Sequence, residues 1–222
     1  SNNWYINKNV IVEIAIAFDN NKKKFYVTYS TNNEKTKVKG SFLHDLSKEE
    51  DFDNPPDLII SAHTFEHVSD IFDQFKMLCE ISADNCKFII EIPSFDTMVN
   101  IARYDQVFHQ HLQYTSLSSM IMLIDRLDCS YVDHVFNYDY WGGTLLFTFE
   151  KTKLKTKNPL FNKMQNDRIQ RGFFDFKHQL MHTKEFCENS EEHSYGFGAA
   201  QMLPLVAHHM ESDMSFLKGI ID

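Results

Sequence analysis

The middle of the sequence alternates between strand-like and helix-like patterns. Residues 58–61 and 88–92 are short apolar runs typical of buried strands, and Pro93 closes the second run. Between them, apolar residues recur at helical spacing at Val68, Ile71, Phe72, Phe75 and Leu78. A strand, a helix and a strand in this order predict a right-handed crossover between two parallel strands. We therefore expect an α/β fold in which helices cover both faces of a parallel sheet.

The pattern continues to about residue 150. Residues 117–127 carry apolar side chains at helical spacing and follow Ser116, a residue suited to cap a helix. Residues 130–136 and 144–149 are strand-like and are joined through Gly142 and Gly143. We predict that residues 1–150 form one domain.

The last part of the chain has a different character. Residues 151–157 are rich in Lys and Thr, which is typical of a surface connection. Residues 159–188 are helical in composition, and residues 195–200 then open a further segment. We predict that residues 151–222 form a helical connection followed by the start of a second, smaller α/β unit.

The N-terminal part contains two β-rich runs. Residues 10–18 and 24–29 flank the turn-forming residues Asp19, Asn20 and Asn21. Taken alone, these runs predict an antiparallel hairpin.

Charge and apolar content limit the possible partners and location. The 222 residues carry a formal net charge of −9, which opposes binding to a phosphate backbone, so we expect no nucleic-acid partner. No apolar run reaches the roughly 18 residues of a membrane helix, and the N-terminus does not resemble a signal peptide. We expect a soluble, cytoplasmic protein that binds a small molecule and is capable of self-association.

The four cysteines give no sign of a disulfide framework or a zinc site. They are far apart and form no CxxC pair: Cys79, Cys86, Cys129 and Cys187. We expect reduced, mostly buried thiols.

Residues 57–70 resemble the mid-domain strand and following helix of Rossmann-like methyltransferases that use S-adenosylmethionine (SAM). In open α/β sheets, ligands bind beyond the carboxyl ends of the strands. The resemblance therefore implies that Ala62 and His63 line the cofactor pocket. It also implies cofactor contacts for Glu13, at the end of a β-rich run, and for Asp45, which resembles the acidic contact to adenine and is equally typical of an ordinary surface acid.

Residues 108–116 resemble the Tyr-His-Glu-His signature, with its later Tyr and Ser, of nucleotide-sugar C-methyltransferases. Residues 141–145 are similar to the His-Gly-Gly-Ser-Leu element of that family, and residues 195–200 to the opening of its C-terminal domain. The resemblance implies a SAM-dependent methyltransferase that methylates carbon on a nucleotide-linked sugar.

Methylation of carbon requires a base that removes a proton beside a carbonyl, and a histidine suits this task. The resemblance assigns the base to His111, with His109 beside it as a second catalytic candidate. It places five further residues at the acceptor: Phe108, Gln110, Tyr114, Trp141 and Gly142. The alternatives are ordinary half-buried histidines and a metal-dependent hydrolase. We expect no metal site, because the sequence places no carboxylate cluster beside these histidines.

The chain departs from the family pattern at three of these positions. Phe108, Gln110 and Trp141 stand where the family has Tyr, Glu and His. Glutamine forms hydrogen bonds but accepts no proton, so position 110 has no acid–base role. Methylation of oxygen or nitrogen on another phosphorylated or nucleotide-linked metabolite therefore stays an alternative.

The glycine-rich turn of SAM methyltransferases has no counterpart near the N-terminus. Ala15, Ile16 and Ala17 follow the strand end at residues 12–14, and Gly40 is the only glycine before Gly142. Only glycine lets the backbone approach the cofactor closely. We expect that the cofactor loop is missing from the printed chain. If nothing is missing, the hairpin and a non-catalytic homologue that has lost SAM binding are the better interpretation.

Overall fold

The structure is a computed structural model. It describes residues 3–7, 10–19, 24–31, 34–40, 55–139, 142–152, 157–190, 192–198, 200 and 202–221, with the backbone alone up to residue 40. The chain divides into two compact units, Ser1–Asn54 and Pro55–Asp222. The division thus falls between Asn54 and Pro55, and not after residue 150 as we predicted.

The first unit is an antiparallel sheet of four strands in sequential order. Its strands are β1 (Asn3–Asn7), β2 (Val10–Asp19), β3 (Lys24–Thr31) and β4 (Glu34–Gly40). Strands β2 and β3 pair from Glu13 opposite Ser30 to Asp19 opposite Lys24, which confirms the predicted hairpin.

The hairpin corrects our interpretation of residues 12–14 as the end of a strand in the Rossmann-like sheet. In the described part of the chain, β2 pairs with β1 and β3 and not with the sheet of the second unit. The physical reason is local: two β-rich runs separated by only a few residues pair with each other at little entropic cost.

The second unit contains the predicted crossover. Strand β5 (Leu58–Ala62) leads through α1 (Ile71–Ile81) to β6 (Lys87–Pro93), and the two strands are parallel. Helix α1 begins where the Asp70 carboxylate accepts a hydrogen bond from the Asp73 N–H at 3.0 Å. A mixed α/β fold is therefore confirmed.

Two antiparallel strands complete this sheet in the order β5-β6-β8-β7. Helix α3 (Leu117–Arg126) follows Ser116, whose predicted capping role is confirmed by its bond from the Ser119 N–H at 3.2 Å. The chain then forms β7 (Cys129–Asn137) and β8 (Thr144–Lys151), and β8 lies between β6 and β7.

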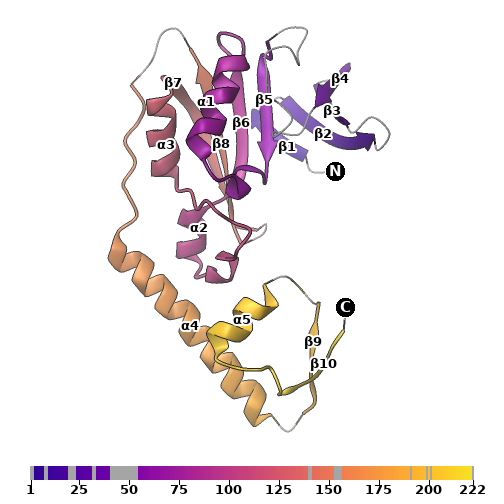
Figure 1. The fold of residues 1–222 in the computed structure, drawn as a ribbon, viewed down its shortest axis with the longest axis vertical. Helices are drawn as coiled ribbons and strands as arrows, with labels where there is room; N and C mark the ends of the chain where they lie inside the picture. The colour runs from indigo at the N-terminus through magenta and orange to yellow at the C-terminus, as the bar shows by residue number, and fades with distance from the viewer. Residues whose placement is uncertain are drawn as a thin grey trace. The chain divides into compact units, whose positions relative to one another are not determined.

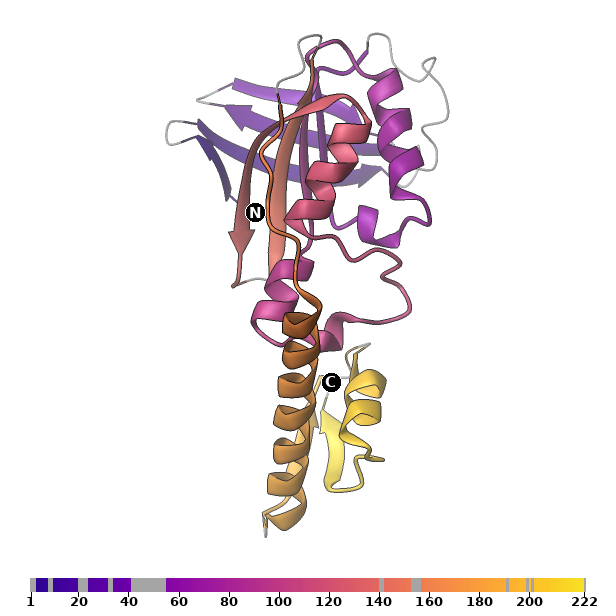
Figure 2. The ribbon, with the colours of Figure 1, turned by 90° about the vertical axis from the view of Figure 1, so that its left-hand side faces the viewer.

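Both α1 and α3 lie on the same face of this sheet (Figures 1 and 2). The core between them contains a stack of aromatic rings, with Phe88 and Phe149 4.4 Å apart and Phe75 of α1 against Phe149 at 5.7 Å. We predicted helices on both faces of the sheet, and α1 and α3 cover one of these two faces.

The remaining residues form a long helix and a small parallel pair of strands (Figure 1). Helix α4 spans Asn166–Asn189, and α5 (Leu203–Met210) lies between β9 (Ser194–Phe197) and β10 (Leu217–Ile221) in the chain. Strands β9 and β10 are parallel, and this segment belongs to the same compact unit as the rest of residues 55–222. No helix in the described part of the chain is long and apolar enough to cross a membrane.

Helix α4 packs against the segment that follows β6. That segment contains α2 (Phe95–Asn100) and the short helix η4 (Tyr104–Gln106). The Tyr104 hydroxyl donates to the Ile169 carbonyl of α4 at 2.6 Å, and Phe176 is buried beside Tyr104.

The cysteines are free thiols in the structure. Cys86 and Cys129 are buried, whereas Cys79 and Cys187 are half-buried.

Candidate functional site

The candidate site lies at the carboxyl ends of the parallel strands β5 and β6. His63 follows β5 and has a positive φ of 50°, a backbone conformation that costs a non-glycine residue about 1 kcal/mol. The His63 N–H donates to the Glu91 carbonyl of β6 at 3.0 Å, so this strained residue is held against the neighbouring strand.

The His63 side chain lies between two buried carboxylates. Its Nδ1 is 3.4 Å from Glu66 Oε1, and its Nε2 is 3.9 Å from Glu91 Oε1. The hydrogen bond to Glu66 raises the pKa of His63 above its usual value. Burial opposes this rise, and the charges of Glu66 and Glu91 add to it.

Glu66 belongs to the short helix η3 (Phe65–His67), and only 3% of its surface is exposed. Phe65 fixes this helix on the core by stacking on Phe75 at 4.2 Å. Glu66 Oε1 faces His63 Nδ1 and also His67 Nε2, which is 3.7 Å away. Glu66 Oε2 is buried and has no hydrogen-bond partner among the residues that the structure describes.

The second buried acid, Glu91, lies in the middle of β6. The Thr144 hydroxyl of β8 donates to its Oε1 at 3.0 Å. Burial raises the pKa of Glu91, whereas the charge of His63 and the bond from Thr144 lower it.

Backbone hydrogen bonds hold the segment around His111 against η3. The N–H groups of Leu112 and Gln113 both donate to the Glu66 carbonyl, at 2.7 and 3.1 Å. In return, His67 Nδ1 donates to the Gln110 carbonyl at 2.7 Å. His111 therefore lies beside the loop that follows β5, as the predicted role requires.

His111 is half-buried among aromatic rings. Its ring centroid lies 4.2 Å from that of Phe108, 5.1 Å from that of His67 and 6.2 Å from that of Tyr114. Burial lowers the pKa of His111, and His67 contributes in the same direction, whereas Glu66 and the Gln106 backbone oppose the change.

The other predicted site residues differ in exposure and contacts, and some lie outside the described residues. The side chains of His109 and Gln110 are exposed, and the Tyr114 hydroxyl donates to the Phe108 carbonyl at 3.4 Å. Ala62 is exposed at the end of β5. Asp45, Trp141 and the side chain of Glu13 lie outside the described part of the chain.

Gly142 has a structural reason to be glycine. Its φ is +75°, and a Cβ at this position would overlap the Gln106 side chain. The next residue, Gly143, accepts a hydrogen bond from the Ser94 N–H at 3.2 Å and so lies beside the end of β6.

Sequence reasoning missed the roles of Glu66, His67 and Glu91. One signal was available: Glu91 is a lone acid inside an apolar strand, and a buried acid requires a partner. The sequence places no carboxylate cluster beside His109 and His111, but the fold brings the single carboxylate of Glu66 against His67 and His111.

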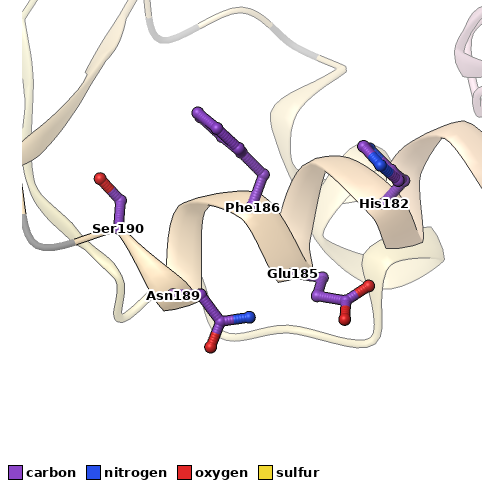
Figure 3. Close-up of a pocket in the computed structure, with 5 residues that line it drawn as sticks. All are labelled: His182, Glu185, Phe186, Asn189 and Ser190. Carbon is purple, nitrogen blue, oxygen red and sulfur yellow. The ribbon is translucent and has the colours of Figure 1, made fainter.

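A hollow of about 370 Å³ at the end of α4 does not have the properties of such a site (Figure 3). Figure 3 shows His182 and Phe186 on one side of the helix and Glu185 and Asn189 on the other. Binding sites contain polar groups that converge, and these side chains diverge.

The proteins to which the chain is similar are methyltransferases. No family model matches the sequence. Over 89 residues the chain is 27% identical to the C-methyltransferase NovU of Streptomyces niveus, a match that covers 40% of this chain and 21% of that protein. The chain thus matches about a fifth of the length of this curated relative.

Two solved structures are distantly similar. One is magnesium protoporphyrin IX methyltransferase (ChlM) from Synechocystis PCC 6803 with bound SAH, with a TM-score of 0.37, 6% identity and coverage of 48% of this chain and 49% of that chain. The other is the N-methyltransferase NodS from Bradyrhizobium japonicum WM9, with a TM-score of 0.33, 14% identity and coverage of 48% and 58%.

Proposed function

We propose that this chain is part of a SAM-dependent methyltransferase that methylates carbon on a nucleotide-linked sugar, with His111 as the base. The sequence match to a C-methyltransferase supports the reaction class. The observation that carries the proposal is the attachment of the His111 segment to η3, directly after β5. This is the edge of an open α/β sheet at which ligands bind.

The residues around His111 suit proton removal from a bound acceptor. Phe108 packs against the imidazole and holds its orientation, and the half-buried setting limits access of water. Tyr114 and the exposed Gln110 flank the same segment and are proposed acceptor contacts, together with His109 as a second polar group.

The cofactor side of the proposed site is less complete than the acceptor side. SAM would supply an electrophilic methyl group. Ala62, small and exposed at the end of β5, permits close approach of a ligand there, and His63 is held beside it. A glycine-rich turn is not among the described residues, because residues 10–31 contain no glycine and β2 and β3 pair as an antiparallel hairpin.

Replacement of His111 tests the base role. We expect His111→Asn to lower methyl transfer from SAM by at least about 100-fold, the usual contribution of a general base. Affinity for S-adenosylhomocysteine should change less than about twofold, since the base does not hold the cofactor. The exposed His193 supplies the matched control, His193→Asn. Turnover of His111→Asn at the unmodified rate would contradict the proposal.

A non-catalytic homologue is a second candidate, and the hairpin of β2 and β3 favours it. It predicts no heat on calorimetric titration with S-adenosylhomocysteine. The O- and N-methyltransferase alternatives predict that mass spectrometry locates the new methyl group on oxygen or nitrogen instead of carbon.

A further inference from the structure

Glu66, His67 and His111 bring three metal-binding atoms together at the edge of the sheet. One ligand atom from each residue lies within 4.8 Å of the other two. Glu66 and His67 are neighbours in η3, whereas His111 comes from a segment more than forty residues later and is held in place by the bonds to the Glu66 carbonyl. The grouping is therefore a product of the tertiary fold.

Glu66 supplies a buried carboxylate with unused binding capacity. Its side chain is 2% exposed, and Oε2 has no hydrogen-bond partner among the described residues. A buried carboxylate is costly unless a cation or hydrogen-bond donors compensate it. Its surroundings therefore favour a positive ion.

His67 presents its second nitrogen to this carboxylate. Because Nδ1 lies 2.7 Å from the Gln110 carbonyl, Nδ1 carries the proton and donates. In the neutral ring, Nε2 then carries a lone pair, and it faces Glu66 Oε1 at 3.7 Å. A histidine that donates one N–H to a backbone carbonyl and directs the other nitrogen to an ion is the usual arrangement of a metal ligand.

His111 completes the group with a buried nitrogen. Its Nδ1 has no hydrogen-bond partner in the described part of the chain. The Phe108 ring, 4.2 Å from the imidazole, restricts its rotation. Two of the three residues thus contain an unsatisfied buried atom, which ordinary packing does not explain.

We propose that Glu66, His67 and His111 bind a divalent transition metal, for which zinc is the best-fitting ion. Two imidazoles and one carboxylate are a known zinc ligand set that leaves a fourth position open. Ligands of a tetrahedral zinc lie roughly 3.4 Å apart, given bonds of about 2.0–2.1 Å. The 3.7 Å between Glu66 Oε1 and His67 Nε2 is near this value. The His111 ligand atom lies within 4.8 Å of both, so a small side-chain movement brings it to bonding distance of the same ion.

The inference goes beyond the proposed function. A neutral imidazole has only one nitrogen with a free lone pair, so a His111 that binds zinc through it has no nitrogen left to accept a proton. Metal binding and the base role of His111 therefore compete, and zinc should inhibit proton abstraction by this residue. The two proposals also fail independently, because metal binding is measured without turnover.

Titration of the chelator-treated full chain with zinc alone tests the site. We expect one zinc ion per chain by calorimetry, and cobalt substitution should give the visible absorption of a low-coordinate site. His67→Ala, which removes an exposed ligand, and the conservative Glu66→Gln should each weaken zinc binding by more than about 100-fold, beyond the effect of outer-shell changes.

A surface histidine and a thermal measurement provide the controls. His182→Ala on α4 should leave zinc affinity unchanged. Zinc should raise the Tm of the unmodified chain by mass action and leave that of His67→Ala unchanged, a comparison that does not depend on the folding of Glu66→Gln. Zinc affinity that persists in both Glu66→Gln and His67→Ala, or less than about 0.2 ions bound per chain, would overturn the proposal.

Discussion

Residue 143 must be glycine for two independent reasons. Its φ is +108°, and a Cβ would overlap the hydroxyl and Cβ of Thr97. Thr97 is fully buried and donates from its hydroxyl to the Ser94 carbonyl at 3.0 Å, so it has no room to move. This close contact places the start of β8 beside the end of β6, where the candidate site lies.

Replacement of Gly143 with alanine should therefore destabilise the protein by about 2–5 kcal/mol, through overpacking and backbone strain together. Gly198 provides the control: its φ is +83°, but nothing lies within 4 Å of a Cβ there. Gly198→Ala should destabilise the protein through backbone strain alone, by about 1–2 kcal/mol. Denaturant unfolding measures both. An equal decrease in the free energy of unfolding in both variants would show that the contact with Thr97 does not contribute.

Glu91 gives the stability a predictable dependence on pH. Burial raises its pKa in the folded state, so the folded protein disfavours the carboxylate. The penalty is absent below the unfolded pKa of about 4.3, grows as pH rises from there, and is complete above the folded pKa. Glu91→Gln removes this charge and keeps an acceptor for the Thr144 hydroxyl.

We therefore expect Glu91→Gln to be more stable than the unmodified chain at pH 7, by less than about 2 kcal/mol. The difference should disappear near pH 4. Thermal unfolding in chelator-containing buffer at both pH values measures it, with the exposed Glu80→Gln as the control. A Glu91→Gln variant that is less stable at pH 7 would contradict the assigned cost of the buried charge.

At the scale of elements, helix α4 illustrates a contact that helix propensity does not reveal. Gly172 is buried in the middle of α4, and a Cβ there would lie 2.9 Å from the Val99 carbonyl oxygen and 3.0 Å from the Tyr104 hydroxyl. Glycine thus allows α4 to approach the end of α2.

Gly172→Ala should consequently destabilise the protein by about 1–3 kcal/mol, although the same change in an exposed helix stabilises by about 1 kcal/mol. The exposed neighbour Arg171 gives the control, because Arg171→Ala should stay within about 0.5 kcal/mol of the unmodified chain. Chemical denaturation compares them. A stabilised Gly172→Ala variant would mean that α4 does not pack on Val99.

Local patterns predicted the elements, and tertiary contacts decided the site. The crossover from β5 through α1 to β6 and the cap at Ser116 follow from apolar spacing and capping chemistry within a few residues. The position of His111 depends instead on bonds from Leu112 and Gln113 to a distant carbonyl, for which the sequence contains no periodic signal. The resemblance to a family supplied that placement.

At the scale of the whole molecule, two patterns competed for the N-terminal residues. The hairpin of β2 and β3 formed because its strands pair within a few residues, whereas the Rossmann-like alternative needed a long crossover. Residues 1–54 are thus a separate compact unit, and the candidate site is built from the second unit.

Backbone amide shifts during titration with S-adenosylhomocysteine test the central claim most directly, namely that the carboxyl edge of β5 and β6 is the ligand site. In chelator-containing buffer, we predict saturable shifts that centre on His63, Thr64 and His111. The control variant His193→Asn should show the same shifts. Absent shifts, or shifts confined to the residues of α4, α5, β9 and β10, would contradict the account.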